Sequence, residues 1–235
     1  MKTVVIVPTY NEKENIRKLV IEILRNEVEV VVVDDNSPDS TWKIVEEMGK
    51  EDKRVHLLLR TKNKGRGLAG VDGFKWSLEK GYDVMIEMDA DFSHDPKYIP
   101  GFLSAIKECD VVLGSRFVNG GREVGRPLLR RMITRFANAY IRWILGLKVR
   151  DCNSGYRCYK RGVLENVGLD KFVSKGPSIV QEMIYRVHLK GFKIGEIPIT
   201  FVEREEGSSK LGPQQLWRGY MMVLKLRFMK ISGKI

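Results

Sequence analysis

The amino-acid sequence predicts an α/β fold, a doubly wound and mostly parallel sheet flanked by helices. In the first half of the chain, apolar runs that favour strands alternate with stretches that favour helices. The apolar runs are continuous, as in the valine-rich segment 28–35, which is typical of strands covered on both faces. A chain of 235 residues is long enough to bury a full core within one domain.

The first two strand–helix pairs begin at the N-terminus. The run VVIVP (4–8) predicts a strand, and the polar pair Asn11 and Glu12 then predicts the start of a helix that ends near Arg25. The second strand is expected at 28–35. Turn-forming residues follow it and are expected to cap a helix near 41–49.

Three more strands are expected before the middle of the chain. The run VHLLLR (55–60) predicts the third strand, and a helix follows it at about 68–80. The run DVMIEMDAD (83–91) predicts the fourth strand. A helix at 96–107 then leads to a fifth strand at 110–114.

The second half of the chain has a different pattern. After a glycine-rich loop, segment 128–145 keeps apolar residues at helical spacing and places arginines on its other faces. Another helix is expected after Gly176, and a strand at 193–204. The tail, 212–235, predicts a basic amphipathic helix. We therefore expect one domain, 1–211, with a C-terminal helical extension.

Positive charge is concentrated in one stretch of the chain. The net charge is +11, and residues 116–161 contain twelve lysines and arginines but only two acidic residues. Such a patch predicts a polyanionic partner, which is a nucleic acid, an anionic lipid surface or a phosphorylated substrate. The N-terminal apolar run is too short for a signal peptide, and no stretch is long enough to span a bilayer. The three cysteines form no C-x-x-C pair, which favours a reducing compartment.

Two carboxylates follow the fourth predicted strand. Asp89 and Asp91 are one residue apart, and ligand sites of open α/β sheets lie at the carboxyl ends of strands. Both can therefore reach a hard divalent cation such as Mg²⁺ or Mn²⁺. Such a cation would neutralise the diphosphate of a departing nucleotide. The alternative is an acidic turn that caps the next helix. His94 either approaches this cation or is a solvent-facing or structural histidine.

The ends of the first two strands are also polar. Asp34 and Asp35 end the second strand, where a carboxylate can bind the base or ribose of a nucleotide or simply form a polar strand end. Pro8, Tyr10, Asn11 and Glu12 end the first strand and would line the same crevice. The alternative for Asn11 is a plain helix N-cap.

A glycine motif suggests a different class of protein. Residues 65–70 match the G-x-G-x-x-G pattern of dinucleotide-binding proteins and open a predicted helix. That pattern belongs after the first strand of a unit, whereas here it follows the third. We therefore expect the glycines to allow close packing of the helix or close approach of the main chain to a nucleotide.

The arginines after the fifth strand divide into two groups. Arg130 and Thr134 are four residues apart on the predicted helix, so they share a face and can bind one phosphate. Arg116 directly follows the fifth strand and would point into the crevice. The remaining arginines are expected on a solvated or lipid-facing surface: Arg122, Arg131, Arg135, Arg142 and Arg150.

Six ordered motifs extend along nearly the whole chain: PTYNE (8–12), VDDNSPD (33–39), MDADFSHDPKYIP (88–100), GSRF (114–117), DCNSGYRCYK (151–160) and IGEIPITFVEREEGSSKLG (194–212). On these motifs the sequence resembles the inverting GT-A glycosyltransferases of family two. The similarity is to dolichol-phosphate mannose synthases and related polyprenyl-phosphate sugar transferases.

The resemblance implies a GT-A fold, with a nucleotide-sugar-binding half at 1–115 and an acceptor-binding half at 116–211. It also implies a role for each matching residue. The metal site would be Asp89 and Asp91, with Asp91 among the catalytic residues. The donor would be bound by Pro8, Tyr10, Glu12, Asp35, Arg204 and Lys210. The acceptor would be bound by Arg116, Arg130, Thr134 and Ser209, with Arg116 and Arg130 also catalytic.

The implied reaction transfers one mannose from GDP-mannose to a dolichyl or polyprenyl phosphate, with Mg²⁺ or Mn²⁺ and inversion at the sugar. Some relatives carry transmembrane helices that this sequence lacks. We therefore expect a peripheral position on the cytoplasmic side of a membrane, with or without a separate membrane-anchoring subunit.

Three alternatives remain open at this point. A UDP-glucose donor would make the protein a polyprenyl-phosphate glucosyltransferase, since a few hydroxyl contacts decide the sugar. A nucleotide-dependent oxidoreductase rests only on the glycines at 65–70. A nucleic-acid-binding protein would use the basic segment 116–161, but the acid pairs at the strand ends would repel phosphate.

Overall fold

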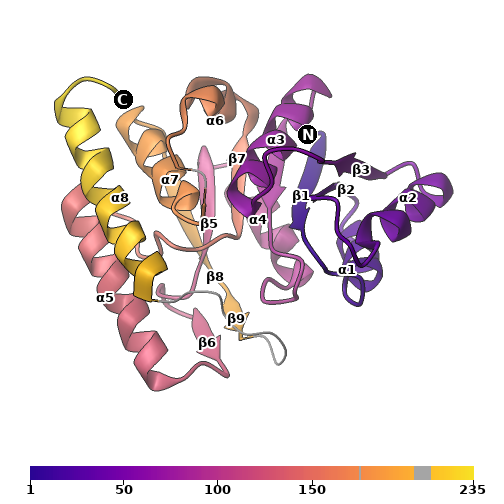
Figure 1. The fold of residues 1–235 in the computed structure, drawn as a ribbon, viewed down its shortest axis with the longest axis horizontal. Helices are drawn as coiled ribbons and strands as arrows, with labels where there is room; N and C mark the ends of the chain where they lie inside the picture. Colours follow the sequence, from indigo (N-terminus) through magenta and orange to yellow (C-terminus); the bar gives the residue numbers. More distant parts are fainter. Residues whose placement is uncertain (175, 204–212) are drawn as a thin grey trace.

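The computed structural model describes residues 1–174, 176–203 and 213–235, with main chain only at 213–216. Its centre is a seven-stranded sheet in the order β3-β2-β1-β4-β7-β5-β8 (Figure 1). The strands are β1 (Thr3–Thr9), β2 (Glu29–Asp34), β3 (Val55–Leu59), β4 (Val84–Glu87), β5 (Val111–Ser115), β7 (Arg157–Lys160) and β8 (Ile194–Pro198). All neighbours pair in parallel except β7, which is antiparallel to both β4 and β5.

A second, two-stranded sheet lies below the carboxyl ends of the main strands in Figure 1. It pairs β6 (Arg122–Val124) with β9 (Thr200–Val202) in parallel. The helices are α1 (Ile16–Leu24), α2 (Thr41–Glu51), α3 (Arg66–Glu79), α4 (Ile99–Ala105), α5 (Leu128–Leu145), α6 (Arg161–Asn166), α7 (Ile179–Leu189) and α8 (Pro213–Ile231), with short 3₁₀ turns at Pro96–Tyr98 and Leu169–Lys171.

The main sheet is buried on both faces, as the continuous apolar runs predict. Alternate residues of a strand point to opposite faces, and two apolar clusters follow this alternation. Val4 and Ile6 pack with α3, α5, α6 and α7, whereas Val5 and Val7 pack with α1, α2 and α4. All four valine and isoleucine side chains are fully buried. The predicted α/β class and two-sided covering are confirmed.

The first helix starts later than expected, and the fourth strand ends earlier than expected. The first helix begins at Ile16, because Asn11 has a positive φ of 61° and the carbonyl of Glu12 accepts hydrogen bonds from the amides of Asn15 and Ile16 in a turn. The fourth strand ends at Glu87. Beyond it the amide of Asp89 donates to Nδ1 of His94, at 3.0 Å, instead of to a neighbouring strand.

Two other features differ in kind from the prediction. The strand expected at 193–204 is two strands, β8 and β9, that belong to different sheets. The chain changes sheet at Ile199, whose carbonyl accepts from the amide of Arg122 while its own amide donates to Ser115. Strand β7 was not predicted, because four residues that include Arg157 and Lys160 lack an apolar run. The expected helix at 128–145 is confirmed as α5.

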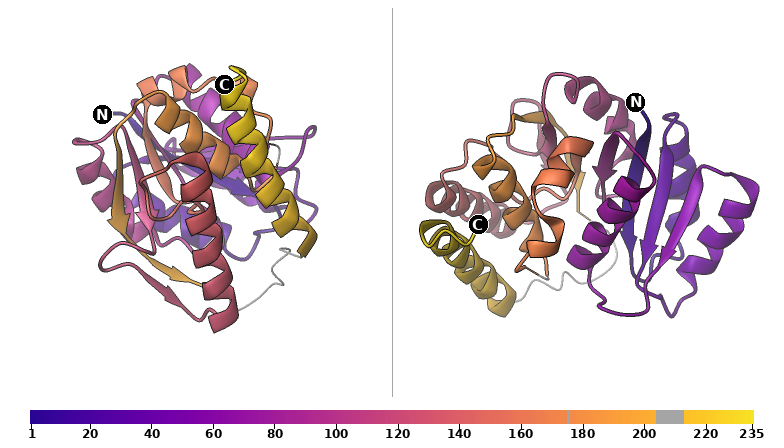
Figure 2. Two further views of the ribbon diagram at one scale, coloured as in Figure 1. Left: turned by 90° about the vertical axis from the view of Figure 1, so that its left-hand side faces the viewer. Right: turned by 90° about the horizontal axis from the view of Figure 1, so that it is seen from above.

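Helices α5 and α8 lie side by side on one flank of the molecule (Figure 2). The ring of Tyr140 on α5 meets that of Tyr220 on α8 edge to face, and the Tyr140 hydroxyl donates to the carbonyl of Tyr220 at 3.2 Å. Farther along, Trp143 and Ile144 line a groove with Leu224 and Phe228. Both helices therefore run in the same direction. In the described parts of the chain, no helix has both the length and the apolar character of a membrane span.

Candidate active site

Polar loops gather where the central strands end. Strand β1 lies between β2 and β4, and the strand order reverses there, since β2 and β3 extend to one side and β4 to the other. Ligands of open α/β sheets bind at this kind of switch point, outside the carboxyl ends of the strands. The candidate site is therefore built from the loops after β1, β2 and β4.

The loops after β1 and β2 form one connected wall. The amide of Asn11 donates to Oγ of Ser37 at 3.0 Å, and the amide of Glu12 donates to Oγ1 of Thr41 at 3.0 Å. Asp34 is fully buried and accepts from the hydroxyls of Thr9, at 2.8 Å, and Ser37, at 2.7 Å. Asp34 therefore holds the two loops together. This structural role favours the polar strand end over nucleotide binding for Asp34.

Asp35 connects this wall to the glycine motif. One oxygen of its carboxylate accepts from Arg60, and the other accepts from the amide of Gly65 at 2.5 Å. Gly65 has a φ of 138°, a backbone conformation that residues other than glycine rarely adopt. The glycines that follow pack α3 against the sheet. A Cβ at Gly70 would lie 2.5 Å from the Glu87 carboxylate, and one at Gly73 would lie 2.5 Å from Ile6. The packing interpretation is confirmed.

The other predicted nucleotide-side residues lie around the same wall. Pro8 is buried within β1, and Tyr10 is half exposed at the end of that strand. The Glu12 carboxylate accepts from the side-chain amide of Asn15 at 3.1 Å. Tyr10 is therefore more exposed than Pro8 and Glu12.

Asp89 and Asp91 follow β4, at the same edge of the sheet as the loops after β1 and β2. Asp89 accepts two hydrogen bonds from Arg66, from Nε at 2.9 Å and from Nη2 at 2.5 Å. Asp91 accepts from the amide of Ser93 at 3.1 Å and from its hydroxyl at 2.6 Å. The loop after β4 thus presents two carboxylates whose positions are fixed by hydrogen bonds.

His94 is a buried residue beneath these carboxylates. Its ring stacks on Tyr156, with centroids 5.0 Å apart, and Nδ1 accepts from the amide of Asp89. We assign the proton of the neutral ring to Nε2 from this contact. Burial lowers the pKa of His94 below its usual value, so the ring is neutral at neutral pH. This arrangement favours the structural alternative for His94.

The carboxylate pair suits a hard divalent cation that also binds substrate. Among the described residues, no three His, Cys, Asp or Glu side chains form a cluster able to hold a metal. Carboxylate oxygens are the ligands that Mg²⁺ and Mn²⁺ prefer, and Mg²⁺ is commonly held by one or two carboxylates together with substrate phosphates. Two carboxylates at the switch point fit a metal that shares its coordination with a diphosphate.

The predicted acceptor residues lie after β5 and on α5, where arginines are paired with acids. Arg116 is buried and donates to both oxygens of Asp151, at 2.7 and 2.8 Å. Arg130 pairs with Glu203, and its side chain is 40% exposed. Thr134 follows one turn later on the same face of α5, and its hydroxyl donates to the carbonyl of Arg130 at 2.9 Å.

Aromatic and charged neighbours connect this side to the metal loop. The ring of Phe201 lies 5.3 Å from the guanidinium of Arg116 and 6.1 Å from the ring of His94. Arg126 reaches Glu123 at 2.6 Å and Glu203 at 3.3 Å. The predicted phosphate-binding residues Arg204, Ser209 and Lys210 lie outside the residues that the structure describes.

Two arginines of this region were missed by the sequence patterns. Arg66 occupies a variable position of the glycine motif, yet its guanidinium donates two hydrogen bonds to Asp89. Arg157 is fully buried on β7 and donates to the carbonyls of Cys152, Ser154 and Val180. It therefore fixes the loop 152–155. A Cβ at Gly155 in that loop would lie 3.5 Å from Oδ2 of Asp89.

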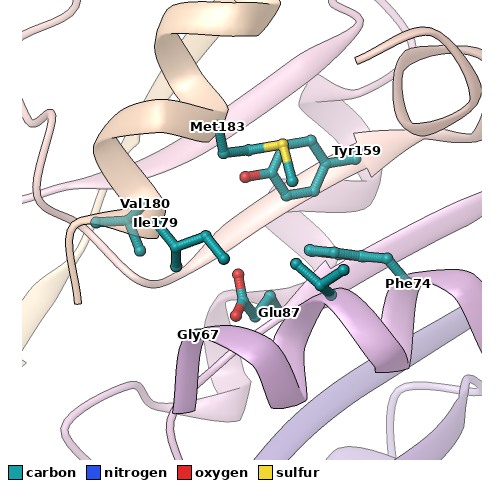
Figure 3. A pocket seen from close by; sticks show the side chains of 8 residues that line it. Gly67, Phe74, Glu87, Tyr159, Ile179, Val180 and Met183 are labelled. Carbon is teal, nitrogen blue, oxygen red and sulfur yellow. The ribbon is translucent and has the colours of Figure 1, made fainter. Parts of the chain in front are cut away.

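A small cavity lies between α3 and α7 (Figure 3). Glu87 points into it together with Tyr159, Ile179 and Met183. Burial raises the pKa of Glu87, and the charges of Arg66 and Arg157 oppose that rise. The lining is mostly apolar and contains neither Asp89 nor Asp91, so the cavity is separate from the proposed metal site.

Comparisons with known proteins find similarity to one family of proteins. The family model described as Glycosyl transferase family 2 matches residues 4–168. The chain is 45% identical over 214 residues to an undecaprenyl-phosphate mannosyltransferase of Micrococcus luteus. The aligned region covers 90% of this chain and 88% of that protein. It is 42% identical over 214 residues to a polyprenol monophosphomannose synthase of Mycolicibacterium smegmatis, covering 89% and 81%.

A solved structure confirms the fold class. Glucosyl-3-phosphoglycerate synthase from Mycobacterium tuberculosis, in complex with Mn²⁺, uridine diphosphate and glucosyl-3-phosphoglycerate, superposes with a TM-score of 0.67. The match covers 97% of this chain and 78% of that one, at 18% sequence identity. At this identity the likeness concerns the fold alone.

Proposed function

This chain belongs to glycosyl transferase family 2, and on that premise we propose that it transfers one mannose from GDP-mannose to a polyprenyl or dolichyl phosphate. The observation that carries the proposal is the pair Asp89 and Asp91 at the switch point, in a chain 45% identical to an undecaprenyl-phosphate mannosyltransferase. The nucleotide lies against the loops after β1 and β2, and the lipid phosphate lies on the arginine side.

Asp89 and Asp91 would hold the divalent cation, Mg²⁺ or Mn²⁺, which supplies charge neutralisation for the departing diphosphate. The lipid phosphate is already anionic at neutral pH, so it needs little help from a general base. The protein's task is therefore to hold two anionic substrates in line. Direct attack on the anomeric carbon inverts its configuration, so an α-linked donor gives a β-linked product.

Arg116, Arg130 and Thr134 are assigned to the acceptor in this proposal. They lie after β5 and on α5, apart in sequence from the loops after β1 and β2, and Arg130 is the more exposed of the two arginines. A partly exposed guanidinium can exchange Glu203 for a phosphate. Arg116, which is buried against Asp151, contributes positive potential and a fixed shape. Arg204, Ser209 and Lys210 would add to the phosphate contacts of donor and acceptor.

The proposed location is peripheral, on the cytoplasmic face of a membrane, where a polyprenyl phosphate is embedded. The support is the flank formed by α5 and α8, which exposes large apolar side chains: Leu128, Leu129, Met132, Phe136, Trp143, Trp217, Met221, Phe228 and Ile231. Exposed basic residues lie among them, including Arg135 and Arg227. Apolar side chains interspersed with basic ones favour an anionic lipid surface. A separate anchoring subunit is compatible with this surface.

A donor panel tests the proposal directly. Labelled GDP-mannose and UDP-glucose are each offered with undecaprenyl phosphate and Mn²⁺, and the lipid product is identified by mass spectrometry. GDP-mannose should give the faster reaction, and a β-mannosidase should release the sugar. Faster transfer from UDP-glucose would support the glucosyltransferase alternative. Transfer to neither lipid nor water from any donor would contradict the function.

A further inference from the structure

Arg66 is a charged residue of the crevice to which the proposed reaction gives no role. It is the first residue of α3, and its side chain reaches across to the end of β4. Two of its nitrogens donate to Oδ1 of Asp89, and Nη1 donates to Glu87 at 3.1 Å. The Arg66 and Asp89 side chains are 33% and 32% exposed, whereas Glu87 is buried. The contact with Asp89 therefore faces the open crevice, while the contact with Glu87 lies beneath it.

The surroundings limit where this guanidinium can move. A Cβ at residue 155 would lie 2.9 Å from Nη2 of Arg66, so the main chain of Gly155 closes one side. Glu87 holds the guanidinium from below. Burial lowers the pKa of Arg66, but the charges of Asp89 and Glu87 outweigh that effect and raise it, so the group stays protonated. The exposed side, toward the crevice, is the direction left open.

A divalent cation and Arg66 compete for the same carboxylate. A metal that binds Asp89 must share the carboxylate with a guanidinium or displace it from Oδ1, and the two positive charges repel each other. A diphosphate that arrives with the metal relieves this conflict, because it offers anionic oxygens to both cations.

We propose that Arg66 couples divalent-cation binding to nucleotide binding, and this inference rests on the proposed function. Without nucleotide, Arg66 pairs with Asp89 and weakens the binding of the cation. With a nucleoside diphosphate, the guanidinium turns from Asp89 to the diphosphate while Glu87 retains Nη1. The cation and the nucleotide then bind cooperatively, since each favours the same position of Arg66.

Titration of Mn²⁺, followed by the electron paramagnetic resonance signal of the free ion, tests this coupling. The wild type and Arg66→Met are compared with and without saturating GDP. Without nucleotide, Arg66→Met should bind Mn²⁺ roughly 5–10-fold more tightly than the wild type, because the competing charge is gone. With GDP the advantage should disappear, and the affinity for GDP in the presence of Mn²⁺ should fall by roughly 10-fold.

Three further proteins control the experiment. Arg66→Gln keeps hydrogen-bonding atoms without the charge and should behave like Arg66→Met, so it carries the test if the methionine variant unfolds. Arg66→Lys keeps the charge without the two contacts to Oδ1 and should be intermediate. Arg25→Met removes an exposed arginine that pairs with Glu22, at 2.8 Å, and should match the wild type.

The possible results separate this inference from the proposed function. A wild type that binds no Mn²⁺, even with GDP or UDP, would contradict the metal site itself. A wild type that binds Mn²⁺ while both uncharged variants bind it no more tightly would overturn only the role of Arg66. UDP should reproduce the effect of GDP, because the diphosphate is common to both, so the identity of the sugar donor does not affect the result.

Discussion

The two sides of the crevice hold their charged groups in different ways. On the proposed nucleotide side, carboxylates accept from main-chain amides and hydroxyls of adjacent loops, as Asp34 does from Thr9 and Ser37. Asp35 and Asp89 are also paired with arginines, Arg60 and Arg66, from the same half of the chain. On the acceptor side, arginines are paired with carboxylates from distant parts of the chain, as Arg116 is with Asp151. The carboxylates of Asp89 and Asp91 lie on the first side, which suits a cation. The partly exposed guanidinium of Arg130 lies on the second side, which suits an anion.

The difference shows how one crevice can bind two anionic substrates. In our proposals a nucleotide diphosphate is attracted to the acidic side through a cation and Arg66, whereas a lipid phosphate is attracted directly to the arginines of the other side. The variants below test whether the two sides have these separate tasks, in order of decreasing effect.

Asp91→Asn should have the largest effect, because it removes a charged oxygen from the proposed metal site. We expect turnover to fall by at least about 100-fold with the fold intact. The measurement is mannosyl transfer at saturating Mn²⁺, with thermal unfolding as the check on folding. Asp170→Asn, at a side chain that is 85% exposed, is the matched control. Full activity of the wild type in excess chelator would remove the metal from the mechanism.

Arg116→Met tests the buried pair on the acceptor side. The Asp151 side chain is fully buried, and removal of its arginine leaves a charge with only backbone donors. Breaking such a pair costs about 3–5 kcal/mol of unfolding free energy. Arg130→Met, at a more exposed pair, should cost less than about 1 kcal/mol. Urea unfolding of both variants measures the difference, and equal losses would show that burial does not distinguish the two pairs.

Arg130→Ala tests the division of labour between the two sides. Loss of a charge-assisted contact to the lipid phosphate should cost about 1.5–3 kcal/mol in kcat/KM for the acceptor. Arg130→Lys should restore part of it. Donor affinity, measured by calorimetry with metal present, should change little. A detergent-dispersed acceptor and an Arg135→Ala control separate this effect from membrane binding. Weakened donor binding with normal acceptor kinetics would assign Arg130 to the donor instead.

The smallest effect is expected on the flank of α5 and α8. The protein should sediment with anionic vesicles at low salt and be partly released at high salt, because salt screens charge but not apolar insertion. A Phe136→Ser, Phe228→Ser protein should show higher release at every salt concentration. Ile21→Ser, at an exposed residue of α1 that is 44% accessible, is the control. Absence of sedimentation at low salt would contradict direct docking.

The same contrast explains what sequence patterns could predict. The loops after β1, β2 and β4 follow apolar runs, so the local sequence predicts both the strands and the acids at their ends. Helix α5 is equally local, since its apolar spacing specifies its bounds. These features depend on residues within a few positions of each other, which periodicity detects directly.

Long-range contacts account for the remainder. Strand β7 has no apolar run of its own and is buried because β4 and β5 enclose it. The pairing of Arg130 with Glu203 joins residues 73 positions apart. Arg66 stands at a position of the glycine motif where any residue is allowed, so its contact with Asp89 has no local signal. The partners of these arginines become visible only in three dimensions.

The antiparallel strand β7 also has a consequence for the order of folding. Strands β1 to β4 pair with one another using residues up to 87, so most of the nucleotide half can form while the rest of the chain is still being synthesised. Strand β5 has to wait, because its sheet partners are β7 and β8, at residues 157–160 and 194–198. Until then, β4 presents an unpaired edge. The main sheet can therefore be completed only after residues 157–160 and 194–198 have been synthesised.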